Sequence, residues 1–213
     1  ICFLDTDDMM SKDRLKKQID IFQKFPNIGV VYSNQIIFNS YTKKKFNFIN
    51  KFNAQITESE KILQRNGATI LNSLIKKEEL IKLGKIFDDK YNIVGDLDLF
   101  FRLSKICKFK YLDESLVTYR LHKNNYSKKN RGEEISELDN WIENGDKNGF
   151  LNLSEKKIII LTTNVRKIVN HIEKKNYLIA LKKIFQLPNN FIKLKLFISL
   201  FIPQKIYFKL INY

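Results

Sequence analysis

Residues 1–8 read Ile-Cys-Phe-Leu-Asp-Thr-Asp-Asp, a short apolar run that ends in an acidic cluster. Such a run is typical of a buried parallel strand whose C-terminal end delivers polar side chains to a site. Asp5 and Asp7 form an Asp-X-Asp pair, and hard divalent cations prefer oxygen ligands while leaving positions open for substrate phosphates. Alone the pair is a weak signal, because acidic residues after strands usually cap a helix or begin a turn. The stretch predicts a strand over 1–4 with a candidate metal site at its end.

Outward from this stretch, the sequence pattern predicts alternating helices and strands. Thr57 and Glu60 have the spacing of a capping box, and Gly84 is a plausible residue to end a helix. The expected helices are 12–25, one after Thr57, 77–83 and one from Asp96; the expected strands are 29–38 and a paired set of short strands, 109–112 and 116–121. Residues 39–53 lack a clean period and predict a loop or an irregular hairpin.

Beyond residue 121 the character of the sequence changes. The polar segment 123–132 predicts a mobile loop. After it only helices are expected, over 133–143, 154–175 and 177–185, with a break at Pro188. We therefore place a boundary at residue 131, between an α/β region (1–131) and a helical, basic extension (132–213).

A second acidic pair lies in the run Gly95-Asp96-Leu97-Asp98-Leu99, which opens an amphipathic helix. At the entrance of that helix, the carboxylate of Asp96 can accept the proton of an attacking hydroxyl group. Asp98 or Arg102 can hold the local geometry by pairing. The simpler alternative is that acidic residues in a first helical turn only complement the helix dipole.

A third candidate element is the run Thr118-Tyr119-Arg120-Leu121-His122, at the end of the last expected strand. A lone histidine is more often structural or solvent-facing than a ligand. His122 nevertheless begins a loop after a strand, a position from which it can reach a bound metal or phosphate, and Arg120 offers a bidentate phosphate donor.

Composition narrows the classes of partner. The net charge of +15 and a pI near 9.6 favour anionic partners, whether nucleic acid, anionic lipid or a phosphorylated substrate. Cys2 and Cys107 show neither a disulfide pattern nor the ligand spacing of a zinc site. No nucleic-acid-binding module is recognisable, and the lysines are spread along the chain, so a basic membrane- or nucleic-acid-binding protein is the alternative rather than the main hypothesis.

In their order, these elements resemble the family 2 glycosyltransferases of the GT-A fold. The resemblance covers about residues 1–130 and is specific because five elements occur in the family's order. The resembling segments are 3–8, 29–33, 73–88, 95–99 and 119–127. The implied fold class is α/β: a partial GT-A (Rossmann-like) sheet with flanking helices, followed by an all-α C-terminal extension.

The resemblance implies an inverting, Mn²⁺- or Mg²⁺-assisted transfer of a sugar from a nucleotide-sugar donor, by default a UDP-sugar, to a hydroxyl group of a saccharide or lipid-linked acceptor. It implies that Asp5 lies near the donor's ribose, that Asp7 binds the metal, and that His122 lies near the donor phosphates, where some members have a metal ligand. Asp96 matches the catalytic base, although Glu-Asp is usual where this chain has Gly95-Asp96. Asp98 is the fallback for that role. Together with Arg120, we count Asp5 and Asp98 as donor-binding candidates.

The resemblance also implies a cytoplasmic role in surface-polysaccharide or glycolipid assembly, at the inner face of a bacterial membrane. The family's nucleotide-binding strand, turn and helices would precede Ile1, so we expect this chain to be a C-terminal portion that is unstable or inactive alone, or else a non-catalytic remnant. The tail, 191–213, mixes Phe, Ile and Leu with lysines and falls short of the ~20 apolar residues of a spanning helix. Contact with a membrane surface and packing on the rest of the chain are both open for it.

Overall fold

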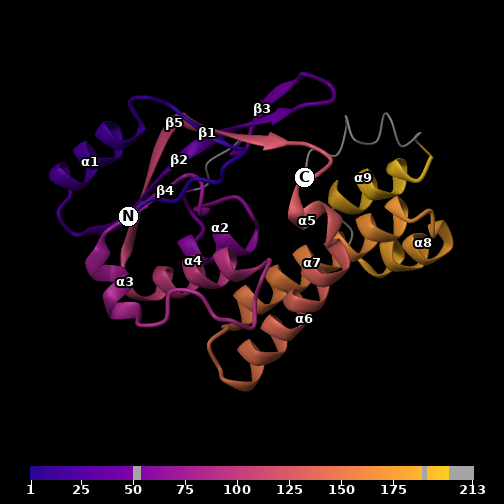
Figure 1. The fold of residues 1–213 in the computed structure, drawn as a ribbon. Helices are drawn as coiled ribbons and strands as arrows, with labels where there is room; N and C mark the ends of the chain where they lie inside the picture. The colour runs from indigo at the N-terminus through magenta and orange to yellow at the C-terminus, as the bar shows by residue number, and fades with distance from the viewer. Residues whose placement is uncertain (50–53, 189–190, 202–213) are drawn as a thin grey trace. The chain divides into compact units, whose positions relative to one another are not determined.

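The computed structural model describes residues 1–49, 54–188 and 191–201 (Figure 1). Its internal contacts divide the chain into two compact units, Ile1–Asn130 and Arg131–Tyr213. The first combines helices with a mixed sheet, and the described residues of the second are helical, which confirms the predicted α/β class and a helical C-terminal region.

The centre of the first unit is a parallel pair formed by β2 (Ile28–Asn39) and β5 (Lys108–Leu121). Val30, Val31 and Tyr32 of β2 are fully buried. The shorter strands are antiparallel to this pair: β1 (Met9–Met10) joins β5, whereas β3 (Lys45–Asn47) and β4 (Ser73–Ile75) join β2. The predicted strand 29–38 is confirmed, and β3 gives the hairpin expected within 39–53, of which 50–53 lie outside the described residues.

Four helices accompany this sheet. They are α1 (Arg14–Lys24), α2 (Glu58–Leu63), α3 (Lys77–Leu83) and α4 (Gly95–Ile106). Helices α2 and α3 pack against α4, on one side of the sheet in Figure 1, whereas α1 packs on β2 and β5. The predicted signals act as expected: both hydrogen bonds of the Thr57–Glu60 capping box form, and Gly84 ends α3 with a left-handed φ of 78°.

The prediction of a strand over 1–4 is wrong. Ile1 forms a pair of backbone hydrogen bonds with Ile75 beside β4, at 2.6 and 2.9 Å, but no regular strand follows. Ile1 and Leu4 remain 47% and 43% exposed. Among the described residues, no strand pairs with the rest of this segment, so residues 2–4 do not form part of the sheet although they are apolar. The first strand is instead β1.

The prediction of two short paired strands near residue 115 is also wrong. Residues 109–112 and 116–121 both belong to β5 and pair with β2, not with each other. The register jumps from Ser33 opposite Leu112 to Asn34 opposite Ser115, which leaves Asp113 and Glu114 in a bulge. Because the residues of this bulge are polar and unpaired, the local sequence resembles that of a turn between two strands.

The last residues of the first unit contain the short helix α5 (Tyr126–Lys129), where we had expected only a loop. The second unit contains α6 (Arg131–Lys147), α7 (Leu153–Glu173), α8 (Tyr177–Gln186) and α9 (Phe191–Ser199). Trp141 and Ile159 are fully buried, and a cluster from α7, α8 and α9 includes Ile168, Ala180 and Leu196. Within the described ranges, none of the helices has the length and apolarity required to cross a bilayer.

Candidate functional site

The first part of the candidate site joins the acidic cluster 5–8 to the end of β5. A turn in which the Asp8 amide donates to the Asp5 carbonyl, at 3.1 Å, shapes the loop. His122 Nε2 lies 2.6 Å from Asp7 Oδ2. This hydrogen bond is the main cause of a lowered pKa of Asp7. Asp7 therefore presents an ionised carboxylate, with 41% of its side chain exposed.

The loop after β5 fixes the orientation of His122. The His122 amide donates to Asn125 Oδ1 at 2.6 Å, and the Asn124 amide donates to His122 Nδ1 at 3.1 Å. A ring nitrogen that accepts a hydrogen bond carries no proton, so the proton of the neutral ring lies on Nε2. In this arrangement His122 donates to Asp7 and orients it. A role as a direct metal ligand stays a prediction and would require the other tautomer.

Asp8 attaches the acidic cluster to the sheet. Its Oδ1 accepts the Arg120 amide at 2.8 Å, and the residue is buried. Burial raises the pKa of Asp8 to about 6, against the opposing effect of this hydrogen bond. The sequence pattern gave Asp8 no role, because three acids in four residues do not show which one turns inward.

Arg120 and Asp5 complete this cluster. Arg120 Nε is buried, and it makes no hydrogen bond within the part of the chain that the structure describes. The Arg120 carbonyl accepts a hydrogen bond from Asn125 Nδ2 at 3.1 Å, which anchors the backbone there. Asp5 is exposed. The positive charge of Arg120 acts to lower the pKa values of Asp7 and Asp8.

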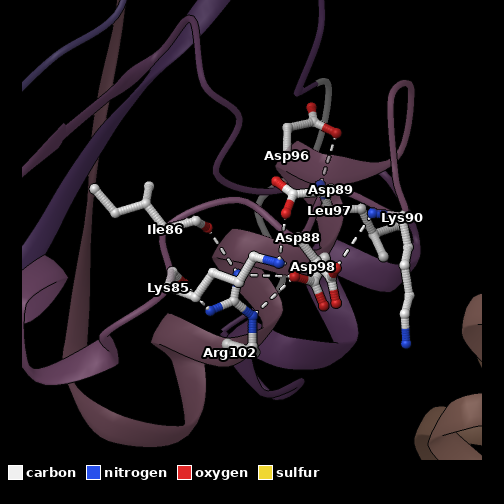
Figure 2. Close-up of polar contacts among 9 residues, drawn as sticks. All are labelled: Lys85, Ile86, Asp88, Asp89, Lys90, Asp96, Leu97, Asp98 and Arg102. Atoms are coloured by element: carbon white, nitrogen blue, oxygen red, sulfur yellow. Dashed lines mark hydrogen bonds and ion pairs between the residues drawn. The ribbon is translucent and has the colours of Figure 1, made fainter.

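The second part of the site is the start of α4, where the two acidic residues differ in surroundings (Figure 2). Asp98 accepts from Arg102 Nε at 2.8 Å and pairs with Nη2 at 2.7 Å. Arg102 also donates to the carbonyls of Lys85 and Ile86, at 2.7 and 2.8 Å. Only 10% of the Asp98 side chain is exposed. This network ties α4 to the loop that precedes it.

Asp96 points away from that network in Figure 2. Its Oδ1 accepts the Leu97 amide at 2.7 Å and lies 3.7 Å from Arg65 Nη1. The side chain is 29% exposed. Arg65 lies just after α2, and the sequence did not predict a role for it. Its backbone has a left-handed φ of 57°, which the residue type does not indicate. Asp96 is thus a positioned but accessible carboxylate.

The structure therefore arranges the six predicted residues in two clusters. Asp5, Asp7, Arg120 and His122 lie together with Asp8, whereas Asp96 and Asp98 lie at the start of α4 with their arginines. No group of three or more His, Cys, Asp or Glu side chains within residues 1–49, 54–188 and 191–201 could hold a metal ion. A metal at Asp7 would take its remaining ligands from substrate and water.

Comparison with known proteins adds no assignment. The sequence matches no model of a known protein family, and a search of the curated proteins found no match.

Proposed function

We propose that this chain is the acceptor-side part of an inverting glycosyltransferase that uses a nucleotide-sugar donor. The observation that carries the proposal is the Asp7–His122 pair beside Arg120, at the carboxyl end of a parallel strand. In α/β sheets, ligands bind outside the carboxyl ends of the strands. The order of motifs that resembles family 2 glycosyltransferases supports the same reaction.

The donor set suits Mn²⁺ or Mg²⁺ at Asp7. Such ions are commonly bound through one or two carboxylates, with substrate phosphates and water as the other ligands. The ion, when bound, offsets negative charge on the departing nucleoside diphosphate. His122 keeps Asp7 oriented. By the resemblance, Asp5 would contact the donor, and Arg120, which is only partly buried, would offer its terminal guanidinium nitrogens to a phosphate oxygen.

We assign the general base to Asp96 and not to Asp98. A general base needs at least one oxygen that an incoming hydroxyl group can reach. The Asp96 side chain is 29% exposed, whereas Asp98 is buried against Arg102. Asp96 would remove the proton of the acceptor hydroxyl group while the oxygen of that hydroxyl group forms a bond to the anomeric carbon. The bond from that carbon to the diphosphate breaks on the opposite face, and the configuration inverts.

The test uses the longest reading frame that contains residues 1–213, so that any other part of the donor site in the same protein is included. Release of the nucleoside diphosphate is measured over a panel of UDP-sugars with Mn²⁺ or Mg²⁺. We expect turnover with one donor and its loss in Asp96→Asn by about 10²–10⁴-fold. Asp89→Asn is the matched control, since Asp89 is 92% exposed. A full rate in Asp96→Asn would remove Asp96 from the role, and inactivity with every donor would favour a non-catalytic remnant.

A further inference from the structure

Helices α8 and α9 of the second unit carry large apolar side chains on their outer surface. We call this surface the α8–α9 apolar face; it comprises Leu178, Phe185, Phe191, Phe197 and Phe201. Leu178 is 78% exposed, Phe201 is 73% exposed and Phe191 is 68% exposed. Single exposed apolar residues are ordinary, but a contiguous group marks a surface that binds something.

These side chains are not needed for the core of the unit. Helix α8 buries Ala180 and Ile184, and α9 buries Leu196, in the cluster they share with α7. The apolar face uses other positions of the same two helices, which lie next to each other (Figure 1), together with Phe201, which follows the end of α9. Each helix therefore has one apolar side in the core and a second apolar side exposed.

Ring contacts make the face continuous across the two helices. The ring centroids of Phe185 and Phe197 are 6.3 Å apart, and those of Phe197 and Phe201 are 5.4 Å apart, both edge to face. Phe185 lies on α8, and Phe197 lies on α9. The three rings form one row instead of separate exposed residues.

Lysines accompany this row. Lys193 Nζ lies 5.9 Å from the Phe185 ring and donates to the Phe185 and Leu187 carbonyls at 3.1 Å, and Lys195 Nζ lies 4.7 Å from the Phe191 ring. Residues 174–213 contain eight lysines and no aspartate or glutamate. A protein partner whose surface carries both acidic and basic residues would not require a segment with lysines alone. An anionic lipid surface, in contrast, attracts each nearby lysine by about 1 kcal/mol.

We propose that the α8–α9 apolar face binds the surface of an anionic lipid bilayer. The phenylalanine and leucine side chains enter the boundary between headgroups and acyl chains, and the lysines lie at the level of the lipid phosphates. The helices lie along the interface and do not cross it. The proposal is independent of the transfer reaction, because lipid binding is measured without donor or acceptor.

The test is flotation of the full chain with vesicles of phosphatidylcholine mixed with phosphatidylglycerol, and with vesicles of phosphatidylcholine alone. We expect binding to the anionic vesicles, weakened by high salt. A variant with Leu178→Gln, Phe185→Gln and Phe191→Gln should bind at least about tenfold more weakly, because it loses the apolar contribution. Leu153→Gln is the matched control: Leu153 is also 78% exposed, but it is at the start of α7.

A charge variant separates the two contributions. Lys182 is exposed on α8, between Leu178 and Phe185 in the sequence. Lys182→Gln with Lys195→Gln should weaken binding to anionic vesicles by roughly tenfold and leave any binding to neutral vesicles unchanged. The proposal is overturned if the wild-type chain binds neither kind of vesicle, or if the triple variant binds as tightly as Leu153→Gln. It is also overturned if the wild-type chain binds anionic and neutral vesicles equally well. Sedimentation of the lipid-free chain tests the alternative that a second copy of the chain covers the face. A dimer that is lost in the triple variant would make the face an interface between two copies.

Discussion

Each of the two acidic clusters of the first unit contains one buried and one accessible carboxylate. In the cluster 5–8, Asp8 is buried and holds the Arg120 amide, whereas Asp7 has 41% of its side chain exposed. At the start of α4, Asp98 is buried against Arg102, whereas Asp96 is 29% exposed. In each cluster one carboxylate therefore stabilises the fold and its neighbour remains accessible. Adjacent acidic residues of the same type are thus not interchangeable candidates for catalysis.

The largest expected effect on stability is at Asp98. The change Asp98→Ala leaves the Arg102 guanidinium without its carboxylate in a mostly buried place, and we expect a loss of about 2–3 kcal/mol of unfolding free energy. Urea denaturation of the chain measures it, with Asp89→Asn as the surface control. An unchanged midpoint for Asp98→Ala would end the structural assignment of this residue.

A smaller effect is expected at His122, through Asp7. Removing the Nε2 donor with His122→Ala should weaken Mn²⁺- or Mg²⁺-dependent binding of a nucleoside diphosphate by about 10–100-fold, as for other residues that orient a metal ligand. Calorimetric titration with UDP and the metal measures this affinity. Gln at this position can still donate to Asp7, so His122→Gln should recover part of the loss. If Gln behaves like Ala, His122 acts as a ligand and not as a positioning residue.

The smallest effect is expected at Asp8. Asp8→Ala removes the acceptor of the Arg120 amide and should cost about 1 kcal/mol of unfolding free energy. Asp8→Asn keeps a carbonyl oxygen at the same place and carries no charge to bury, so its stability should equal or exceed that of the wild type. A more destabilised Asn variant than Ala variant would show that the charge itself is required.

The sequence predicted the secondary structure better than the burial and the contacts of individual side chains. The helices, the capping box and the strand β2 follow from patterns within a few residues. Helix α1 shows the limit. Leu15 and Ile19 recur at helical spacing, yet both side chains are exposed, whereas Arg14 and Gln18 are buried. Periodicity reports that two faces differ, but not which face meets the sheet.

The polar face of α1 can be buried because the sheet supplies partners. Arg14 Nη2 donates to the Ser73 carbonyl at 2.9 Å, and Gln18 Nε2 donates to the Asn72 carbonyl at 2.9 Å. Contacts of this sequence separation leave no local signal. The same is true of the candidate site: the motifs predicted Asp7, Asp96 and His122 as candidates, but the contacts of Asp8 and Arg65 join residues that are far apart in the sequence.

The most direct test compares Asp96→Asn with Asp98→Asn in the longest reading frame that contains this chain. Both the rate of nucleoside diphosphate release and the urea midpoint are measured for each variant. We predict that Asp96→Asn keeps the wild-type midpoint and loses the reaction, whereas Asp98→Asn lowers the midpoint. Full activity in Asp96→Asn, with the rate lost in a stably folded Asp98→Asn, would contradict the division of roles between the two carboxylates.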